Sequence, residues 1–205
     1  MRKFCFALPC AGFLFSIFAC SFLFAPVAGR YNPSDPQNEI PTVELVPTAD
    51  GWVESTPGAD FSQTILWINN ASTIATPIMR FDRDDLPANV VSAELHLWIS
   101  VSATADTEIH AHPILEQWSP SSISDASDPW MVVQDGSFFD PAIMASIVVL
   151  KNAHDVYVVL DLTEVYERMI EAGNHGIYLE CTASAMNLHS SRAANPPKLR
   201  ITGYD

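Results

Sequence analysis

The sequence has little cysteine outside its first thirty residues. Three of its four cysteines lie in an N-terminal apolar run, and Cys181 is the fourth. A domain that keeps only Cys181 cannot form an internal disulfide bond. Cys181 falls within the apolar pattern GIYLECTAS. At such a position we expect a small buried hydrophobic side chain rather than a reactive thiol.

Basic residues are also scarce. The chain has 10 Lys and Arg against 24 Asp and Glu, and its formal net charge is -14. No Lys or Arg occurs between Arg83 and Lys151. An acidic surface repels phosphate backbones, so we expect no nucleic-acid partner. The acidity suits solubility outside the cell, and acidic loops could also supply the oxygen ligands that calcium prefers.

The common catalytic motifs are missing. The sequence contains no G-x-S-x-G, no H-E-x-x-H and no Gly-rich phosphate loop. Asp84 and Asp85 are adjacent, so they would diverge on a strand, and we expect them to begin a turn before Leu86-Pro87. The sequence therefore favours a non-catalytic protein, although glycosidase carboxylates come from distant positions and leave no local motif.

One long hydrophobic run is present, at the N-terminus. Two basic residues precede the run FCFALPCAGFLFSIFACSFLFAPVAG, which has the layout of a secretory signal. We predict a signal peptide over residues 1–29, cleaved after Gly29 or, alternatively, after Ala25. Lipidation at Cys20 and a retained anchor stay open, because the run is long enough to span a bilayer. Each outcome predicts an extracellular or cell-surface location.

Residues 30–42 form a polar, proline-bearing segment that we interpret as a linker. Residues 43–205 have the size of one domain with its own core. Short apolar runs rich in β-branched and aromatic residues, separated by turn residues, predict strands in this domain. We expect them near 43–46, 63–69, 77–82, 90–101, 107–115, 147–150, 156–161, 176–182 and 198–203.

One short helix is predicted near 163–172. Asp161 or Thr163 can cap its start and Gly173 can end it. Its expected apolar stripe consists of Val165, Met169 and Ile170. Many short strands with one helix predict an all-β fold, an antiparallel β-sandwich that is jelly-roll-like. The Ser-, Asp- and Pro-rich segment 119–141 is expected to be a long excursion off the sheet.

Four motifs follow one another in a recognisable order: PIMRFDRDDLPANVVSAELHLWIS, ILEQWSPSSIS, VVLDLTEVYERMIEAGNHGIYLECTAS and SSRAANPPKLRITGYD. In this order and spacing the chain resembles DNRLRE-type domains, which are extracellular β-sandwich modules of bacterial and archaeal surface proteins. The resemblance covers about residues 43–204, although the string that names the family is absent. Members resemble a carbohydrate-binding module family, so the resemblance implies a secreted module that binds extracellular polysaccharide.

In two segments, ELHLWIS and EIHAHPI, apolar residues alternate with Glu, His and Trp. On a strand, Glu94, His96 and Trp98 would share one face, as would His110 and His112. A hairpin through VSATADT would bring the three histidines together with a three- or five-residue loop and separate them with a four-residue loop. Both registers stay open. Such alternation is also typical of any strand in a sheet that has one buried and one solvent-exposed face.

The heptapeptide HAHPILE has the H-x-H-x(3)-E spacing of cupin metal sites. Imidazoles and a carboxylate suit zinc, copper or iron, so His110, His112 and Glu116 are the metal alternative. However, the glycines that flank the cupin motif and its second motif are missing. We therefore expect His96, His110 and His112 to be solvent-facing polar positions on one sheet, without a bound transition metal.

Sugar binding needs flat aromatic rings beside hydrogen-bonding side chains. Trp98 shares a face with His96, and Trp130 lies in a predicted loop, whereas Trp67 and Trp118 are expected in the core. The predicted polysaccharide contacts are Trp98, Trp130, His96, Glu94, His110 and His112. A neutral glycan, or an acidic one bridged by calcium, suits the acidic chain. The main alternative is a structural or self-assembling matrix protein, and a cupin-like metal-dependent enzyme is the minor one.

Overall fold

The structure is a computed structural model that describes residues 40–56, 58–82, 87, 89–101, 103–183 and 185–204. The predicted signal peptide, most of the predicted linker and the predicted turn at Asp84 and Asp85 lie outside these residues. No helix in the described part is long and apolar enough to cross a bilayer.

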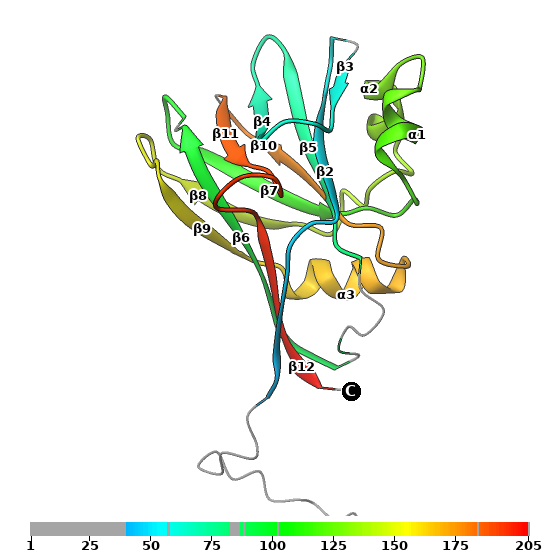
Figure 1. The fold of residues 1–205 in the computed structure, drawn as a ribbon, viewed down its shortest axis with the longest axis vertical. Coiled ribbons are helices and arrows are strands. Elements are labelled where there is room, and N and C mark those ends of the chain that lie inside the picture. Colours follow the sequence, from blue (N-terminus) through cyan, green and yellow to red (C-terminus); the bar gives the residue numbers. More distant parts are fainter. Residues whose placement is uncertain are drawn as a thin grey trace, which may run out of the picture. The chain divides into compact units, whose positions relative to one another are not determined.

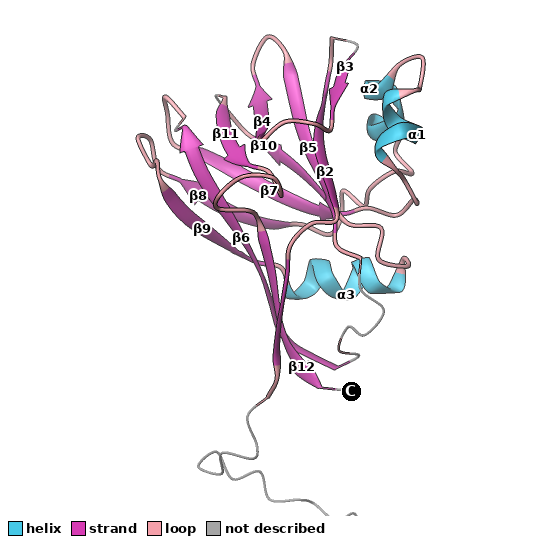
Figure 2. Ribbon diagram, in the orientation of Figure 1, coloured by secondary structure: helices cyan, strands magenta, loops and turns pink. Residues whose placement is uncertain are grey.

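The described chain is built mostly of short antiparallel strands (Figures 1 and 2). The strands are β1 (Thr42–Leu45), β2 (Ala49–Glu54), β3 (Gly58–Asp60), β4 (Ile65–Asn70), β5 (Ile74–Arg80), β6 (Asn89–Val101), β7 (Thr107–Pro113), β8 (Ala145–Val149), β9 (Val156–Asp161), β10 (Ile177–Cys181), β11 (Met186–His189) and β12 (Lys198–Tyr204). The helices are α1 (Pro120–Ser124), α2 (Pro129–Gln134) and α3 (Thr163–Glu171). This arrangement confirms the predicted all-β, sandwich-like fold.

The strands form two layers, which we call sheet A and sheet B. In sheet A, β6 pairs with β9 along one edge and with β12 and β11 along the other, and β1 and β4 lie outside these. Sheet B has the order β8-β7-β10-β5-β2-β3. The far end of β4 also pairs with β5, at Asn69 and Asn70, so the two sheets are continuous through this hairpin.

The main core lies between the two sheets. Along β6, Leu95, Leu97 and Ile99 are fully buried, so the alternation predicted for this segment is confirmed. The α3 helix packs against β6 and β7 and closes the same core with Val165, Tyr166 and Met169. The predicted stripe was wrong in one position, because Ile170 is 37% exposed and Tyr166 is buried in its place.

A second core lies on the outer face of sheet B, where α1 and α2 cover β2 and β3 (Figure 2). Both helices fall in the segment 119–141, so the prediction of a single helix was incomplete. Ser119 caps α1 and Asp128 caps α2, each followed by a proline in the first turn. These start signals explain why a Ser-, Asp- and Pro-rich segment forms two short helices instead of an open loop.

The predicted hairpin between β6 and β7 was wrong. β6 belongs to sheet A and β7 to sheet B, and the chain between them crosses from one sheet to the other. The core-facing side of each strand points toward the opposite sheet. His96 therefore lies on the outer face of sheet A, whereas His110 and His112 lie on the outer face of sheet B.

Candidate functional site

Partly exposed aromatic rings gather on the outer face of sheet A. The ring of Trp98 on β6 meets Tyr157 on β9 edge-on, with 5.0 Å between the ring centroids. On the other side of Trp98, His189 on β11 lies 6.0 Å away with its ring tilted by 34°. His96 is in edge contact with Tyr157 at 6.3 Å. We call these four residues the aromatic face.

Polar groups fix the rings of the aromatic face. His189 Nδ1 donates to the Asn195 carbonyl at 3.2 Å, and the Tyr157 hydroxyl donates to the Pro196 carbonyl at 3.3 Å. Because His189 Nδ1 holds the proton, a neutral His189 leaves Nε2 free to accept a hydrogen bond. His96 Nε2 lies 3.0 Å from Glu94 Oε2. The predicted neighbours Glu94, His96 and Trp98 are thus brought together on one face.

A row of charged side chains runs beside the aromatic face. Lys198 Nζ on β12 lies 2.9 Å from Glu44 Oε1 on β1, and Arg200 lies on the same strand as Lys198. The hydrogen bond from Lys198 lowers the pKa of Glu44, and the same bond raises the pKa of Lys198. The position of these cations beside Trp98 cannot be predicted from local sequence patterns, because they lie on a strand about a hundred residues further along the chain.

The other tryptophans are distributed between the core and the two outer faces. Trp118 is only 3% exposed and donates through Nε1 to the His175 carbonyl, which confirms its predicted place in the core. Trp67 is partly exposed between two buried neighbours on β4, so it points to the outer side of sheet A and its predicted core position was wrong. Trp130 lies in α2 rather than in a loop.

Trp130 also lines a pocket of about 110 Å³ on the sheet B side, between α2 and the ends of β4, β5 and β10. Gln134 and Tyr178 share this lining, and the Gln134 amide donates to the Tyr178 hydroxyl at 2.6 Å. Glu180, which lies opposite His110 in the pairing of β10 with β7, is also part of this lining.

His110, His112 and Glu180 converge on the outer face of sheet B, and we call them the histidine cluster. One potential ligand atom from each lies within 4.8 Å of the others. Glu180 Oε1 is 3.4 Å from His110 Nδ1 and 3.4 Å from His112 Nε2. The pairing of β7 with β10 causes this convergence, because it sets Glu180 opposite His110 and Tyr178 opposite His112.

The members of the histidine cluster differ in exposure. The side chain of His112 is 3% exposed, that of His110 17% and that of Glu180 43%. The expectation that all three histidines face solvent on one sheet was therefore wrong. Phe139 and Tyr178, which stack in parallel with centroids 4.1 Å apart, flank His112 and shield it.

The charges around the cluster favour ionised carboxylates. Contact with His112, and then with His110, lowers the pKa of Glu180 against the opposing effect of desolvation. Hydrogen bonds from Ser146 and His110 lower the pKa of Glu108. Both carboxyl groups therefore carry negative charge at neutral pH, next to two imidazoles.

Glu116, the carboxylate of the predicted cupin-like set, is not part of the histidine cluster. It lies beyond the end of β7 and accepts a hydrogen bond from the Ser137 hydroxyl. Glu180 occupies the position beside the histidines instead. Alternation along GIYLECTAS places Glu180 on the face opposite Leu179, but only the strand order reveals which histidines it meets.

The chain matches no protein-family model, and no curated protein was found to be similar to it. The resemblance to DNRLRE-type domains therefore stays a prediction that rests on the four motifs.

Proposed function

We propose that the chain is an extracellular, non-catalytic module that binds polysaccharide across the aromatic face of sheet A. The observation that carries this proposal is the position of Trp98, a partly exposed indole held edge-on by Tyr157 and flanked by His189. An aromatic ring fixed on an open sheet offers the flat apolar surface on which a sugar ring can stack.

The polar neighbours supply the second requirement of sugar recognition. Glu94 and His96 lie next to Trp98 on the same strand, and Nε2 of a neutral His189 can accept a hydrogen bond. Such donors and acceptors can hydrogen-bond sugar hydroxyls around the stacked ring. The predicted secretion signal agrees with an extracellular ligand, and the paired charges of Glu44 and Lys198 favour a neutral glycan over a strongly acidic one.

Self-association is the second candidate function, and the edge strands favour it. β8 and β9 each end a sheet, and they expose Val148 (56%), Val156 (41%) and Val159 (40%). An unpaired strand edge with apolar side chains can pair with another copy of the chain. A structural or matrix-forming role would use these edges, whereas sugar binding would use the aromatic face.

Affinity electrophoresis of the protein in gels that contain single polysaccharides, together with a glycan array, tests the proposal. We expect at least one neutral polysaccharide to retard the wild-type protein. Trp98→Ala should weaken binding by roughly tenfold, which is about 1.4 kcal/mol, because it removes the stacking surface. Trp98→Phe should retain part of the affinity.

Trp130 was also predicted as a polysaccharide contact, but it lies partly buried in α2, which covers sheet B, and not on the aromatic face. Trp130→Ala is therefore the matched control for the proposed surface. It should leave retardation unchanged, and circular dichroism should show that each variant is folded. Two results would count against the proposal: a wild-type protein that no glycan retards, or equal losses for the variants at 98 and 130. Ordered polymers seen by electron microscopy, without glycan binding, would support the self-associating alternative.

A further inference from the structure

We propose that the histidine cluster is a binding site for a divalent transition metal ion of the zinc class, with His110 Nδ1, His112 Nε2 and Glu180 Oε1 as ligands. Ligand atoms about 2.1 Å from a tetrahedral ion lie about 3.4 Å from one another. The carboxylate oxygen of Glu180 lies 3.4 Å from each of the two imidazole nitrogens. Both separations are long for a hydrogen bond, which is typically about 2.9 Å, and equal the spacing of two ligands on one ion. The ligand atoms of the two imidazoles lie within 4.8 Å of each other, so a small rotation of the exposed Glu180 and His110 side chains lets all three bind one ion.

The second observation is a buried ring nitrogen, His112 Nε2, that lacks a hydrogen-bond partner. His112 itself is 97% buried. Nδ1 of the same ring lies 3.1 Å from the Ile143 carbonyl, which can only accept, so Nδ1 carries the proton. A neutral His112 therefore points the bare lone pair of Nε2 at the Glu180 carboxylate. A cation between the two atoms satisfies both.

Both imidazoles also have an orienting partner on the nitrogen that would not bind the ion. The Ile143 carbonyl holds His112, and Glu108 Oε2 lies 3.5 Å from Nε2 of His110. Metal-binding histidines almost always direct their second nitrogen to a carbonyl or carboxylate, which fixes the tautomer and the ring. The chain thus supplies the supporting contacts of a metal site as well as the ligands.

The donor set indicates the class of ion. Two imidazoles and one carboxylate suit zinc and its first-row neighbours, whereas calcium prefers six or more oxygen ligands. Three protein ligands leave one tetrahedral position open. Glu180 is 43% exposed and also lines the 110 Å³ pocket, so water or a small ligand can approach the proposed ion from the side of this carboxylate. The site is independent of the aromatic face, which lies on the other sheet.

Isothermal titration calorimetry with zinc chloride tests the proposal. The full chain would carry Cys5→Ser, Cys10→Ser and Cys20→Ser, so that the thiols of the N-terminal run cannot bind zinc, and would be stripped with a chelator in mild detergent. We expect about one zinc ion per chain. His110→Ala and Glu180→Gln should each weaken the affinity by about 100-fold or more, and Glu108→Gln by about 10-fold.

The matched control is His96→Ala, which removes a histidine of equal exposure, 17%, that also lies next to a glutamate. It should leave zinc affinity unchanged, and millimolar calcium should not displace the zinc. Thermal melts identify unfolded variants, and His112 is left intact because it is buried. The proposal is wrong if the folded protein binds no zinc, if Glu180→Gln has no effect, or if His96→Ala costs as much affinity as His110→Ala.

Discussion

Cys181 shows how far burial controls the chemistry of a single side chain. It faces the main core from β10 and is 4% exposed. Desolvation raises the pKa of its thiol to about 11, so almost no thiolate exists at neutral pH. This placement confirms the structural role expected from the apolar sequence around it.

We predict that Cys181 in the folded protein does not react with an aromatic disulfide reagent at pH 8. In protein with Cys5, Cys10 and Cys20 replaced by serine, absorbance should report less than a tenth of a thiol per chain before unfolding and one thiol in guanidinium chloride. The reason is twofold, since the sulfur is both shielded and protonated. Complete reaction of the native protein within seconds would contradict this prediction.

At the residue scale, alternation predicts which side chains share a face but not which strands become neighbours. It placed His110 beside His112, and Trp98 beside His96, as the structure shows. It could not supply Glu180, because that carboxylate comes from β10, 70 residues further along the chain than His110. Side chains on one strand are fixed by local geometry, whereas the partner strand depends on long-range pairing.

Among the elements, the turn into β10 depends on a glycine. Gly176 has a φ of 109°, and its carbonyl accepts a hydrogen bond from Ile114 N at 2.9 Å. A Cβ at this position would collide with the Met79 carbonyl oxygen on β5. The close approach allows β10 to lie between β5 and β7, which carries Glu180 to the histidines.

We predict that Gly176→Ala lowers the free energy of unfolding by more than about 2 kcal/mol, because it adds both backbone strain and a collision with main-chain atoms. Gly136→Ala is the control, since no atom beyond Gly136 and its two chain neighbours lies within 4 Å of the added carbon. It should change stability by less than about 0.5 kcal/mol. Urea denaturation followed by circular dichroism measures both, and equal midpoints for the two variants would refute the argument.

The strands that the sequence patterns did not predict are short or contain residues that favour turns. β2 has the sequence ADGWVE, in which Asp50 and Gly51 suggest a loop, and β3 is only three residues long. β11 is a four-residue strand. Tertiary contacts stabilise these segments, whereas β6 and α3 were predicted closely because their own periodic patterns specify them.

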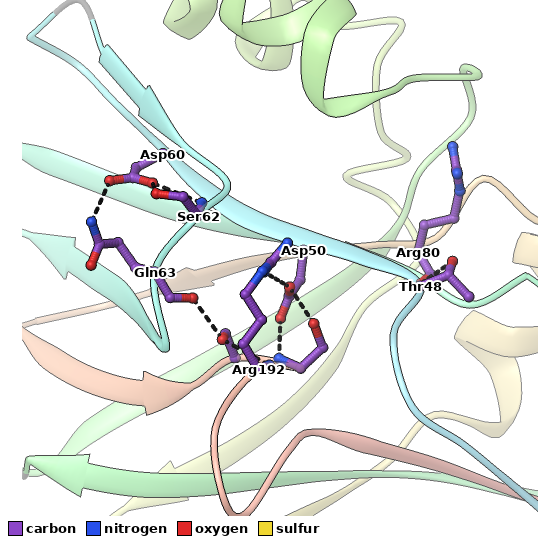
Figure 3. Close-up of polar contacts among 9 residues, drawn as sticks. Thr48, Asp50, Asp60, Ser62, Gln63, Arg80 and Arg192 are labelled. Carbon is purple, nitrogen blue, oxygen red and sulfur yellow. Dashed lines mark hydrogen bonds and ion pairs between the residues drawn. The ribbon is translucent and has the colours of Figure 1, made fainter.

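For the whole molecule, one buried carboxylate joins the two sheets. Asp50 on β2 is fully buried and accepts hydrogen bonds from Ser191 N at 2.6 Å and from the Ser191 hydroxyl at 2.8 Å (Figure 3). Arg192 Nη1 lies 2.8 Å from the same carboxylate. Both partners belong to the connection between β11 and β12 of sheet A.

We predict that Asp50→Ala lowers the free energy of unfolding by about 3 kcal/mol, because it leaves polar groups of Ser191 without partners between the sheets. Arg192→Gln should cost less than Asp50→Ala, because the two hydrogen bonds from Ser191 remain on the buried carboxylate and the exposed end of the Arg192 side chain is already in water. Thermal and urea unfolding measure both values. A larger loss for Arg192→Gln than for Asp50→Ala would show that the buried carboxylate does not join the sheets.

The same connection reaches the aromatic face. At its start, Asp50 binds Ser191, and the Ser190 hydroxyl donates a hydrogen bond to the Gln63 carbonyl. At its end, the carbonyls of Asn195 and Pro196 accept hydrogen bonds from His189 and Tyr157. The rings beside Trp98 are therefore ordered before any ligand arrives. Ordering a mobile side chain on binding costs about 0.5–1.5 kcal/mol, and this surface avoids much of that entropic loss. Its preorganisation depends on a carboxylate that no ligand on the aromatic face would touch.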